Sequence, residues 1–589
     1  MTETHLTGNA LRVLEARYLR RDGRGRVIET PHEMFARVAR AIGLAGQRCD
    51  GADPTGAYLD LLTSLDFLPN SPTLMNAGTG RGQLSACFVL PVEDSLEDIF
   101  EAIKRMALIQ RTGGGTGFSF SRLRPRGDAL STSGGEASGP VSFLRIFDCA
   151  TANIKQGGRR RGANMGILRV DHPDILEFIR LKPDQHSAQN FNLSVGITDD
   201  FMRALERDEP FDLLHPCTRV KTRTLPAREV FDAIAQAAWT CGDPGLVFLD
   251  AINRANPTPH LGVIEATNPC GEIPLLPNEA CNLGSINLTH MLRSGDAPRE
   301  VDWDKLRRTV HLAVQFLDDV IEASVFPFDE ITAIVRGNRK IGLGVMGFAD
   351  TLIALGLSYD SDEAVAVAEK LMSFIAQESL AASAELAVRR GVYPNWKGSV
   401  HEARGARVRN ATCTAIAPTG TIGIIADASA GIEPLFALAY RRSHVLGEQT
   451  LPEINPLFLK HATRLGLGAG PLMDAVRACG SLRGVPGVPD EMARLFVTAL
   501  EIPPARHLQM QAAFQRHVDN SVSKTINLPS DATPSDIAGI YQRAWALGLK
   551  GITLFRQGCK PAQVLEPGLG EDAHFHEHAA RCDPGECRL

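Results

Sequence analysis

Apolar residues recur every three or four positions over long parts of the chain, which is the spacing of an amphipathic helix. Between Asn9 and Ala45, the patterns L-R-V-L-E-A-R-Y-L and M-F-A-R-V-A-R-A-I predict two helices, the second with Thr30 as its N-cap and Pro31 at its first position. The same spacing predicts helices from Ser95 to Gln110 and from Pro534 to Leu549. The chain is therefore expected to begin with a small helical region.

Strand-like segments alternate with these helices. A glycine-rich run, T-G-G-G-T-G, leads into a segment where Phe118 and Phe120 alternate with serine, and K-G-I-T-L-F-R-Q-G at 550–558 is predicted to be the final strand. The region from Val301 to Arg390 has long amphipathic patterns and is predicted to be helical scaffold without catalytic residues. Periodicity alone therefore predicts a helix-rich α/β protein.

The composition describes a globular protein that is long enough to bury a large core. The 589 residues carry a net charge of -6, and 44% of them are hydrophobic, so no basic surface for duplex nucleic acid is expected. No apolar run has the length of a membrane span, and the N-terminus M-T-E-T-H-L-T-G has the features of neither a signal nor a transit peptide, which predicts a cytoplasmic protein without a membrane partner. The 12 scattered cysteines are expected to be reduced thiols, available for catalysis or redox chemistry.

One stretch, T-N-P-C-G-E-I-P-L-L-P-N-E-A-C-N-L-G-S-I-N-L at 267–288, crowds polar side chains into an otherwise apolar loop. Its prolines exclude a helix, because each lacks an N–H and biases the preceding residue away from the α region. An extended loop is predicted, in which Asn268, Cys270 and Glu272 point the same way into one cavity, with Cys281 following on the same stretch. Such a cavity has the character of an active site.

Two interpretations of Cys270 are open from the residues alone. A buried structural cysteine in a proline-rich connection is the common case. A cysteine nucleophile normally has a basic histidine beside it, and the nearest histidines in the sequence, His260 and His290, lie outside the stretch. The crowding of an amide, a carboxylate and a second thiol around Cys270 lowers the odds of a purely structural role.

The motif N-P-C-G-E, followed by a second cysteine eleven residues after the first, resembles the finger loop of ribonucleotide reductases, specifically the adenosylcobalamin-dependent class. The resemblance implies that Cys270 carries the thiyl radical that abstracts the 3′ hydrogen, that Glu272 takes the proton of the 3′-hydroxyl, and that Asn268 holds the ribose hydroxyls. It also implies the fold: a ten-stranded α/β barrel of two parallel five-stranded halves set antiparallel, with the finger loop through its centre. Motifs in the family's order span nearly the whole chain.

Other motifs match further positions of that family. In the segment ending Q-L-S-A-C, Cys87 matches the redox partner of Cys281. The resemblance implies that the substrate is held by Thr73, Ser85, Ala86, Gly115, Pro418, Thr419, Gly420, Thr421 and Ile422, the last five around the diphosphate. It implies that deoxynucleoside triphosphate or ATP effectors are bound by Asp94, Arg124, Lys155, Gln156, Arg160 and Arg161. Asp94 is equally a candidate N-cap of the following helix, and the basic loop is equally a candidate solvated loop.

The chain ends in C-D-P-G-E-C-R-L on a polar, glycine-rich segment. By the resemblance, Cys582 and Cys587 re-reduce the active-site disulfide and receive electrons from thioredoxin or glutaredoxin. The expected organisation is an N-terminal helical region (1–68), a catalytic barrel with its specificity-site loops (69–560) and a flexible redox tail (561–589).

What the sequence lacks selects the class. Reductases that receive their radical from a di-iron subunit need a tyrosine pair near the last strand, where this chain has Leu554 and Phe555, and neither the C-terminal radical glycine nor the four-cysteine zinc site of the glycyl-radical class is found. We therefore expect a homodimeric enzyme without a protein-bound metal that converts ribonucleoside diphosphates into 2′-deoxyribonucleoside diphosphates, using adenosylcobalamin. A regulatory nucleotide-binding paralogue and a cysteine acyltransferase or amidotransferase are the alternatives.

Overall fold

The computed structural model describes residues 4–129, 134–156, 160–183, 187–293, 295, 299–446, 449–560 and 565–569. The chain forms two compact units. The first comprises Met1–Pro434 and Ala499–Pro561, and the second comprises Leu435–Thr498 and Ala562–Leu589. Among the described residues, no helix combines the length and the apolar character needed to cross a membrane.

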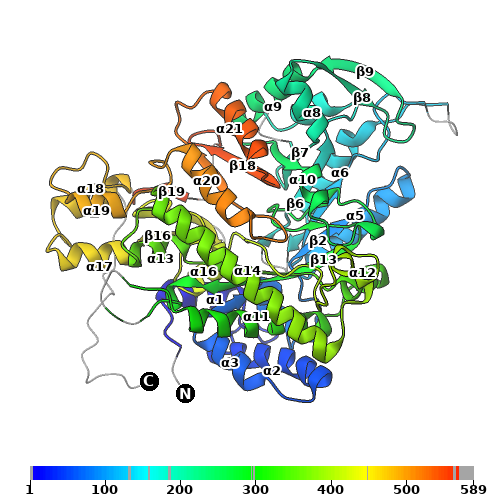
Figure 1. The fold of residues 1–589 in the computed structure, drawn as a ribbon. Coiled ribbons are helices and arrows are strands. Elements are labelled where there is room, and N and C mark those ends of the chain that lie inside the picture. Colours follow the sequence, from blue (N-terminus) through cyan, green and yellow to red (C-terminus); the bar gives the residue numbers. More distant parts are fainter. Residues whose placement is uncertain are drawn as a thin grey trace. The chain divides into compact units, whose positions relative to one another are not determined.

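The first unit begins with helices α1 (Gly8–Arg17), α2 (Pro31–Asp50) and α3 (Thr55–Thr63) (Figure 1). The predicted start of α2 is confirmed. The Thr30 hydroxyl accepts a hydrogen bond from the Glu33 N–H, and the Glu33 carboxylate accepts one from the Thr30 N–H, so two otherwise orphaned backbone donors are satisfied. A helical entry therefore precedes the sheet, as the periodicity predicts.

The sheet of the first unit contains a parallel half of five strands, in which each strand pairs with the strand of this half that follows it in the sequence. Its strands are β2 (Cys87–Leu90), β3 (Gly115–Ser119), β6 (Asn164–Arg169), β7 (Phe191–Ile197) and β10 (Gly245–Phe248). All but a few of their side chains are buried, which is the pattern of strands covered on both faces.

A second parallel half runs through β13 (Glu279–Asn287), β14 (Ile341–Met346), the segment 412–416, β17 (Thr525–Leu528) and β18 (Gly551–Arg556). The segment 412–416 contributes isolated bridges, Leu343 to Thr414 and Ile416 to Val522, in place of a continuous strand. The two halves join antiparallel, β13 to β2 and β18 to β10, which closes a ring of ten segments within the described residues. The ten-stranded barrel of two opposed parallel halves is therefore confirmed.

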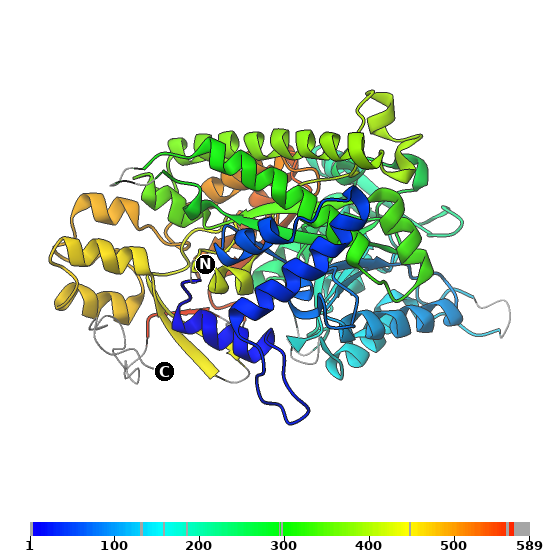
Figure 2. The same ribbon diagram turned by 90° about the horizontal axis from the view of Figure 1, so that it is seen from below.

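Helices cover the outside of this ring. The long helices α11 (Trp303–Ala323) and α14 (Asp362–Arg390) run side by side in both views (Figures 1 and 2). The prediction that 301–390 is helical scaffold is wrong in one part, because β14 lies inside it and is a barrel strand. Its six residues are all buried, so their apolar run was not distinguishable by periodicity from a buried helix segment.

Shorter elements complete the first unit. The helices are α4 (Ser71–Asn76), α5 (Leu96–Arg111), α6 (Gly139–Ala152), α7 (Ile175–Ile179), α8 (Asp199–Glu206), α9 (Ala227–Cys241), α10 (Leu249–Arg254), α12 (Asp329–Asn338), α13 (Phe348–Ala354), α15 (Val400–Ala403), α16 (Gly420–Ile425), α20 (Pro504–Gln515) and α21 (Pro534–Ala546). Strand β1 (Phe67–Pro69) pairs with β13, and two hairpins are β4 (Lys155–Gln156) with β5 (Arg160–Arg161) and β8 (Pro210–Leu214) with β9 (Lys221–Pro226).

The second unit is a small sheet with helices. Its strands are β15 (Ala439–Leu446), β16 (Gln449–Ile454) and β19 (Leu565–Pro567), in the order β16-β15-β19. Its helices are α17 (Pro456–Arg464), α18 (Pro471–Cys479) and α19 (Asp490–Leu495). Strand β19 lies in the stretch 561–589 that was predicted to be the C-terminal tail, and it pairs with β15 of the second unit.

Candidate active site

The stretch around Cys270 forms a tight hairpin, which we call the finger hairpin. Its strands are β11 (Ala266–Thr267) and β12 (Pro274–Leu275). The Asn268 N–H donates to the Ile273 carbonyl at 3.2 Å, and the Asn268 Oδ1 accepts from the Ile273 N–H at 3.0 Å. Gly271 takes a φ of 82°, which suits a residue without Cβ. The prediction of an extended loop is therefore wrong: the residues form a closed turn.

The finger hairpin lies inside the ring of strands. A Cβ placed on Gly117 of β3 would meet the Thr267 carbonyl oxygen at 1.7 Å, so this strand accepts the hairpin only because it has glycine there. On β7, Asn192 donates its side-chain amide to the Pro269 carbonyl at 2.7 Å. The Ser521 N–H donates to the Glu272 carbonyl at 2.8 Å. Contacts from both halves of the barrel thus hold the finger at its centre.

The turn exposes one functional side chain and buries two. Cys270 is exposed, whereas Asn268 and Glu272 are each 2% exposed. Burial raises the pKa of Glu272 to about 7, opposed in part by a hydrogen bond from the Asn268 side chain. Among the described residues, the Glu272 Oε2 atom has no hydrogen-bond partner. This carboxyl group is therefore set up to exchange a proton near neutral pH.

Cys87 and Cys281 lie directly opposite each other on paired strands β2 and β13. Both are buried thiols, 3% and 1% exposed. Burial raises the pKa of both thiols. The Asn268 amide donates to the Cys87 Sγ at 3.2 Å, which links the pair to the finger turn. The structure thus brings together the five residues that the resemblance placed at the reacting centre, Asn268, Cys270, Glu272, Cys87 and Cys281.

The predicted substrate residues lie on segments that border these cysteines. The Gly115 N–H donates to the Ala86 carbonyl at 2.8 Å, and the buried Thr73 hydroxyl donates to the Leu84 carbonyl at 3.0 Å, next to Ser85. Ala417, which precedes the turn at 418–422, packs in the same apolar cluster as Cys87 and Cys281. At that turn Thr419 has a φ of 52° and its hydroxyl accepts from the Gly431 N–H at 2.7 Å. The turn opens α16, whose N-cap is Thr419.

The predicted effector residues fall into two groups. Asp94 binds Arg124, with its carboxylate 2.7 Å from the Arg124 Nε, while Ser95 caps α5, so the alternative that Asp94 is the N-cap is wrong. Both residues follow the carboxyl ends of β2 and β3. Lys155, Gln156, Arg160 and Arg161 form the β4–β5 hairpin, which precedes β6. Because β2, β3 and β6 are parallel, the two groups lie at opposite ends of these strands.

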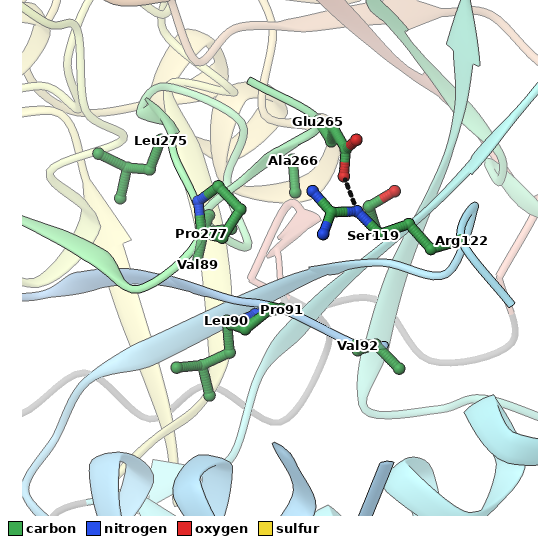
Figure 3. Close-up of a pocket in the computed structure, with 10 residues that line it drawn as sticks. All are labelled: Val89, Leu90, Pro91, Val92, Ser119, Arg122, Glu265, Ala266, Leu275 and Pro277. Atoms are coloured by element: carbon green, nitrogen blue, oxygen red, sulfur yellow. Dashed lines mark hydrogen bonds and ion pairs between the residues drawn. The ribbon is translucent and has the colours of Figure 1, made fainter. Parts of the chain in front are cut away.

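The base of the finger hairpin borders a pocket (Figure 3). It is lined by Val89, Leu90, Pro91, Val92, Ser119, Arg122, Glu265, Ala266, Leu275 and Pro277. Arg122 bridges two carboxylates here, Glu93 and Glu265, with 2.9 Å between the Arg122 Nε and the Glu265 carboxylate. None of the predicted site residues lines this pocket, and the ion pairs tie the finger's first strand to the segment after β3.

Cys582 and Cys587 lie outside the described residues. Asn192 and Ser521, which fix the finger turn, were not predicted, because they meet it only through the closure of the barrel. An asparagine in a strand and a serine in a connecting segment give no signal by spacing or residue type that could have identified them.

Comparisons with known proteins agree with this geometry. The family model described as "Ribonucleotide reductase, barrel domain" matches residues 85–555, and that described as "Ribonucleotide reductase, all-alpha domain" matches residues 4–82. Proteins named vitamin B12-dependent ribonucleoside-diphosphate reductase from Thermoplasma acidophilum and Mycobacterium tuberculosis are both 51% identical to the chain, covering 96% of it and 81% of their own length. In fold, the class Id ribonucleotide reductase alpha subunit of Actinobacillus ureae is similar, with a TM-score of 0.76 at 24% identity, over 94% of this chain and 97% of that one.

Proposed function

The chain belongs to the ribonucleotide reductase family, and from this premise we propose that it reduces ribonucleoside diphosphates to 2′-deoxyribonucleoside diphosphates with adenosylcobalamin as its radical source. The observation that carries the proposal is the finger turn at the centre of the barrel, where the exposed Cys270 lies close to two buried cysteines that face each other. The activity in the names of relatives at 51% identity supports the diphosphate substrate and the vitamin B12 dependence.

The surroundings of Cys270 fit a bulky radical source. Cys270 is exposed, and apart from chain neighbours no atom lies within 4 Å of the position that a Cβ on Gly271 would take. Adenosylcobalamin supplies, when bound, an organic radical by homolysis of its cobalt–carbon bond. Cys270 gives up its thiol hydrogen atom, and its sulfur then removes the 3′ hydrogen of the ribose. The last barrel strand carries Leu554 and Phe555 rather than a tyrosine pair, so it offers no side-chain route for a radical from a second subunit.

Glu272 and Asn268 handle the proton and the ribose. A carboxyl group with a pKa of about 7 is present in both protonation states near neutral pH, so Glu272 takes the proton of the 3′-hydroxyl and can return it. The Asn268 amide already bonds the Cys87 Sγ through its nitrogen. It therefore orients the ribose hydroxyls from a position fixed between the finger turn and the cysteine pair.

Cys87 and Cys281 supply the two electrons. The 2′-hydroxyl leaves as water while the two thiols become a disulfide, so one ribonucleotide and two thiols give one deoxyribonucleotide, one water molecule and one disulfide. Their direct pairing across β2 and β13 suits a bond between the two sulfur atoms. Cys582 and Cys587 re-reduce this disulfide by thiol exchange and take their electrons from thioredoxin or glutaredoxin.

The substrate's two ends are assigned to different segments. Ser85, Ala86 and Gly115 border the ribose, since they lie beside Cys87 on β3 and on the segment before β2. Thr73 on α4 belongs to the same group, since its hydroxyl bonds the Leu84 carbonyl next to Ser85. The diphosphate is assigned to the turn at 418–422, where α16 begins and where Gly420 has open space around it. Backbone N–H groups at the start of a helix favour phosphate oxygens.

Effector binding and a homodimer belong to the same proposal. Helix α5 exposes Leu96 and Phe100, 61% and 51% exposed and one turn apart, and the neighbouring α6 exposes Ile146. An apolar face of this kind on two adjacent helices suits a second copy of the chain. The apolar face begins at Leu96, two residues after Asp94. A dimer formed through this face places the Asp94–Arg124 pair beside the subunit interface, where the pair can bind a nucleotide effector.

The direct test is turnover of CDP by the full chain with a dithiol, with and without adenosylcobalamin. We expect dCDP to form with the cofactor and not without it. CTP in place of CDP tests the diphosphate assignment, and a higher kcat/KM for CTP would overturn it. Formation of dCDP without cobalamin would contradict the proposed radical source.

A further inference from the structure

A buried ion pair lies beside Cys281 and is not used by the mechanism above. Glu279 and Cys281 are two residues apart on β13, so their side chains point to the same face of the sheet. Lys340 directly precedes β14, whose Ile341 pairs with Asn282 of β13. The Lys340 Nζ and the Glu279 Oε2 are 2.8 Å apart, and the two side chains are 1% and 0% exposed.

Glu279 makes more hydrogen bonds than Lys340 does. The Glu279 carboxylate accepts three hydrogen bonds: one oxygen accepts from the Asn338 amide at 2.6 Å, and the other accepts from Lys340 and from the Leu276 N–H at 2.9 Å. An ammonium group carries three N–H donors. Among the residues that the structure describes, the Lys340 ammonium has one acceptor, Glu279. Lys340 therefore keeps donors for a negative charge that arises nearby.

Cys281 is the neighbour at which such a charge can arise. Its thiol now donates to the carbonyl oxygens of Asn282, at 3.3 Å, and of Lys340 itself, at 3.4 Å. Burial raises the pKa of the Cys281 thiol, the Glu279 carboxylate raises it further, and Lys340 lowers it. A thiolate at this position is costly unless a cation is close to it.

We propose that Lys340, held in place by Glu279, is a positioning residue that stabilises Cys281 as the leaving thiolate when the Cys87–Cys281 disulfide is re-reduced. In that step an incoming thiolate attacks the Cys87 Sγ, the sulfur–sulfur bond breaks, and its electron pair passes to the Cys281 Sγ. A second thiol of the same dithiol then displaces Cys87, and both cysteines end protonated. The inference rests on the proposed function, which makes these two cysteines the reducing pair.

The charged and titratable groups that face Cys281 come from several elements. Cys87 lies opposite on β2, Glu272 approaches from the finger turn, and Glu279 and Lys340 flank the thiol. The buried Lys550 also interacts with Lys340 and has its pKa lowered to about 8 by burial. Glu272 and Glu279 both disfavour the thiolate, which makes Lys340 the group that opposes them at this sulfur.

The test compares Lys340→Met and Lys340→Arg with Arg339→Met as a matched control. Arg339 is the adjacent residue, is equally buried, and binds Asp318 of α11 at 2.8 Å. Among the described residues it makes no hydrogen bond to Cys281. The reference protein and every variant carry Cys582→Ser and Cys587→Ser, so that the tail thiols cannot re-reduce the Cys87–Cys281 pair. The full-length enzyme is oxidised by one turnover without external reductant, then mixed with dithiothreitol, quenched at intervals and alkylated. Mass spectrometry of the peptide carrying Cys281 gives the rate of thiol recovery at pH 7, 8 and 9.

We expect Lys340→Met to recover ~10–100-fold more slowly than wild type, because a leaving thiol of higher pKa leaves more slowly. Lys340→Arg and Arg339→Met should stay within about threefold of wild type. Recovery of Lys340→Met at the wild-type rate and with the wild-type pH profile would overturn the inference. If Cys281 remains reduced after one turnover of the reference protein that lacks the tail thiols, the proposed function itself fails, and the two outcomes are thereby distinguished.

Removal of Lys340 alone leaves an unpaired carboxylate in the barrel and can prevent folding. The double variant Glu279→Gln/Lys340→Met removes both charges and should fold, as circular dichroism will show. The inference predicts that Cys281 of this double variant recovers ~10-fold or more slowly than Cys281 of the single variant Glu279→Gln, which lacks the same carboxylate and keeps the cation. Recovery by a folded double variant at the rate of Glu279→Gln would overturn the inference as well.

Discussion

The variant Glu272→Gln measures how much stability the protein loses when the buried Glu272 side chain at the finger turn ionises. Burial raises the pKa of Glu272 to about 7 from the usual 4.5. A raised pKa means that the folded protein prefers the protonated form, so the stability that this group contributes is complete below pH 4.5 and is lost as the pH rises through 7. At pH 8 the raised pKa of Glu272 lowers the free energy of unfolding by about 3 kcal/mol, compared with a folded protein in which this pKa stayed at its usual value. Glutamine is neutral throughout and has no such loss.

The assay is denaturant unfolding of wild type and Glu272→Gln between pH 5 and 8. We expect the variant's free energy of unfolding, relative to wild type, to rise by about 3 kcal/mol over the titration of Glu272. Asp319, whose pKa burial raises to about 6, titrates in the same range in both proteins and cancels in the difference. Parallel pH dependences for the two proteins would refute the reasoning.

The same variant tests the role of the carboxyl group in the reaction. Positioned proton transfer is typically worth ~10²–10⁴-fold in rate, so kcat of Glu272→Gln should fall by that factor while nucleotide affinity is retained. Affinity is measured separately by equilibrium binding of CDP. A change confined to affinity would mean that Glu272 only binds the substrate.

Two further perturbations separate the parts of the account. Changing Cys87 or Cys281 to serine should stop reduction even with dithiothreitol. Changing Cys582 or Cys587 to serine should stop thioredoxin-supported turnover and leave much of the dithiothreitol-supported turnover, because a small dithiol replaces the tail cysteines as electron donor. Equal losses of dithiothreitol-supported turnover in all four variants would refute the role of the tail cysteines. Gly117→Ala places a Cβ against the carbonyl of the finger's first strand, so it should lower the melting temperature and abolish turnover together, and a stable, active variant would contradict the seating of the finger.

Local sequence signals predicted the parts of the fold that depend on neighbouring residues. The cap at Thr30 and the helix that follows it depend on residues within one turn, and both are confirmed. The finger turn was predicted wrongly, because the rule that prolines extend a chain neglects the Asn268 side chain, which closes the turn by bonding the Ile273 N–H. The helix spacing around 301–390 also concealed β14, whose buried residues carry no period-2 pattern.

The candidate site divides in the same way. The five residues at the centre were found through a motif that crowds them into one stretch and one short strand. Lys340 was not found, since its partner Glu279 lies 61 residues away and nothing in either local sequence marks the contact. Asn192 likewise becomes a finger support only when the barrel closes. Contacts between distant segments depend on the whole topology and are not readable from residue spacing.

Cys270→Ser tests the central claim most directly. A serine O–H bond is too strong to replace the thiol as a hydrogen-atom donor, and the small change in size at an exposed position leaves the turn intact. In the presence of adenosylcobalamin, CDP, effector and dithiothreitol, we expect wild type to form dCDP and the variant to form none while binding CDP with unchanged affinity. Measurable dCDP from Cys270→Ser would contradict the account.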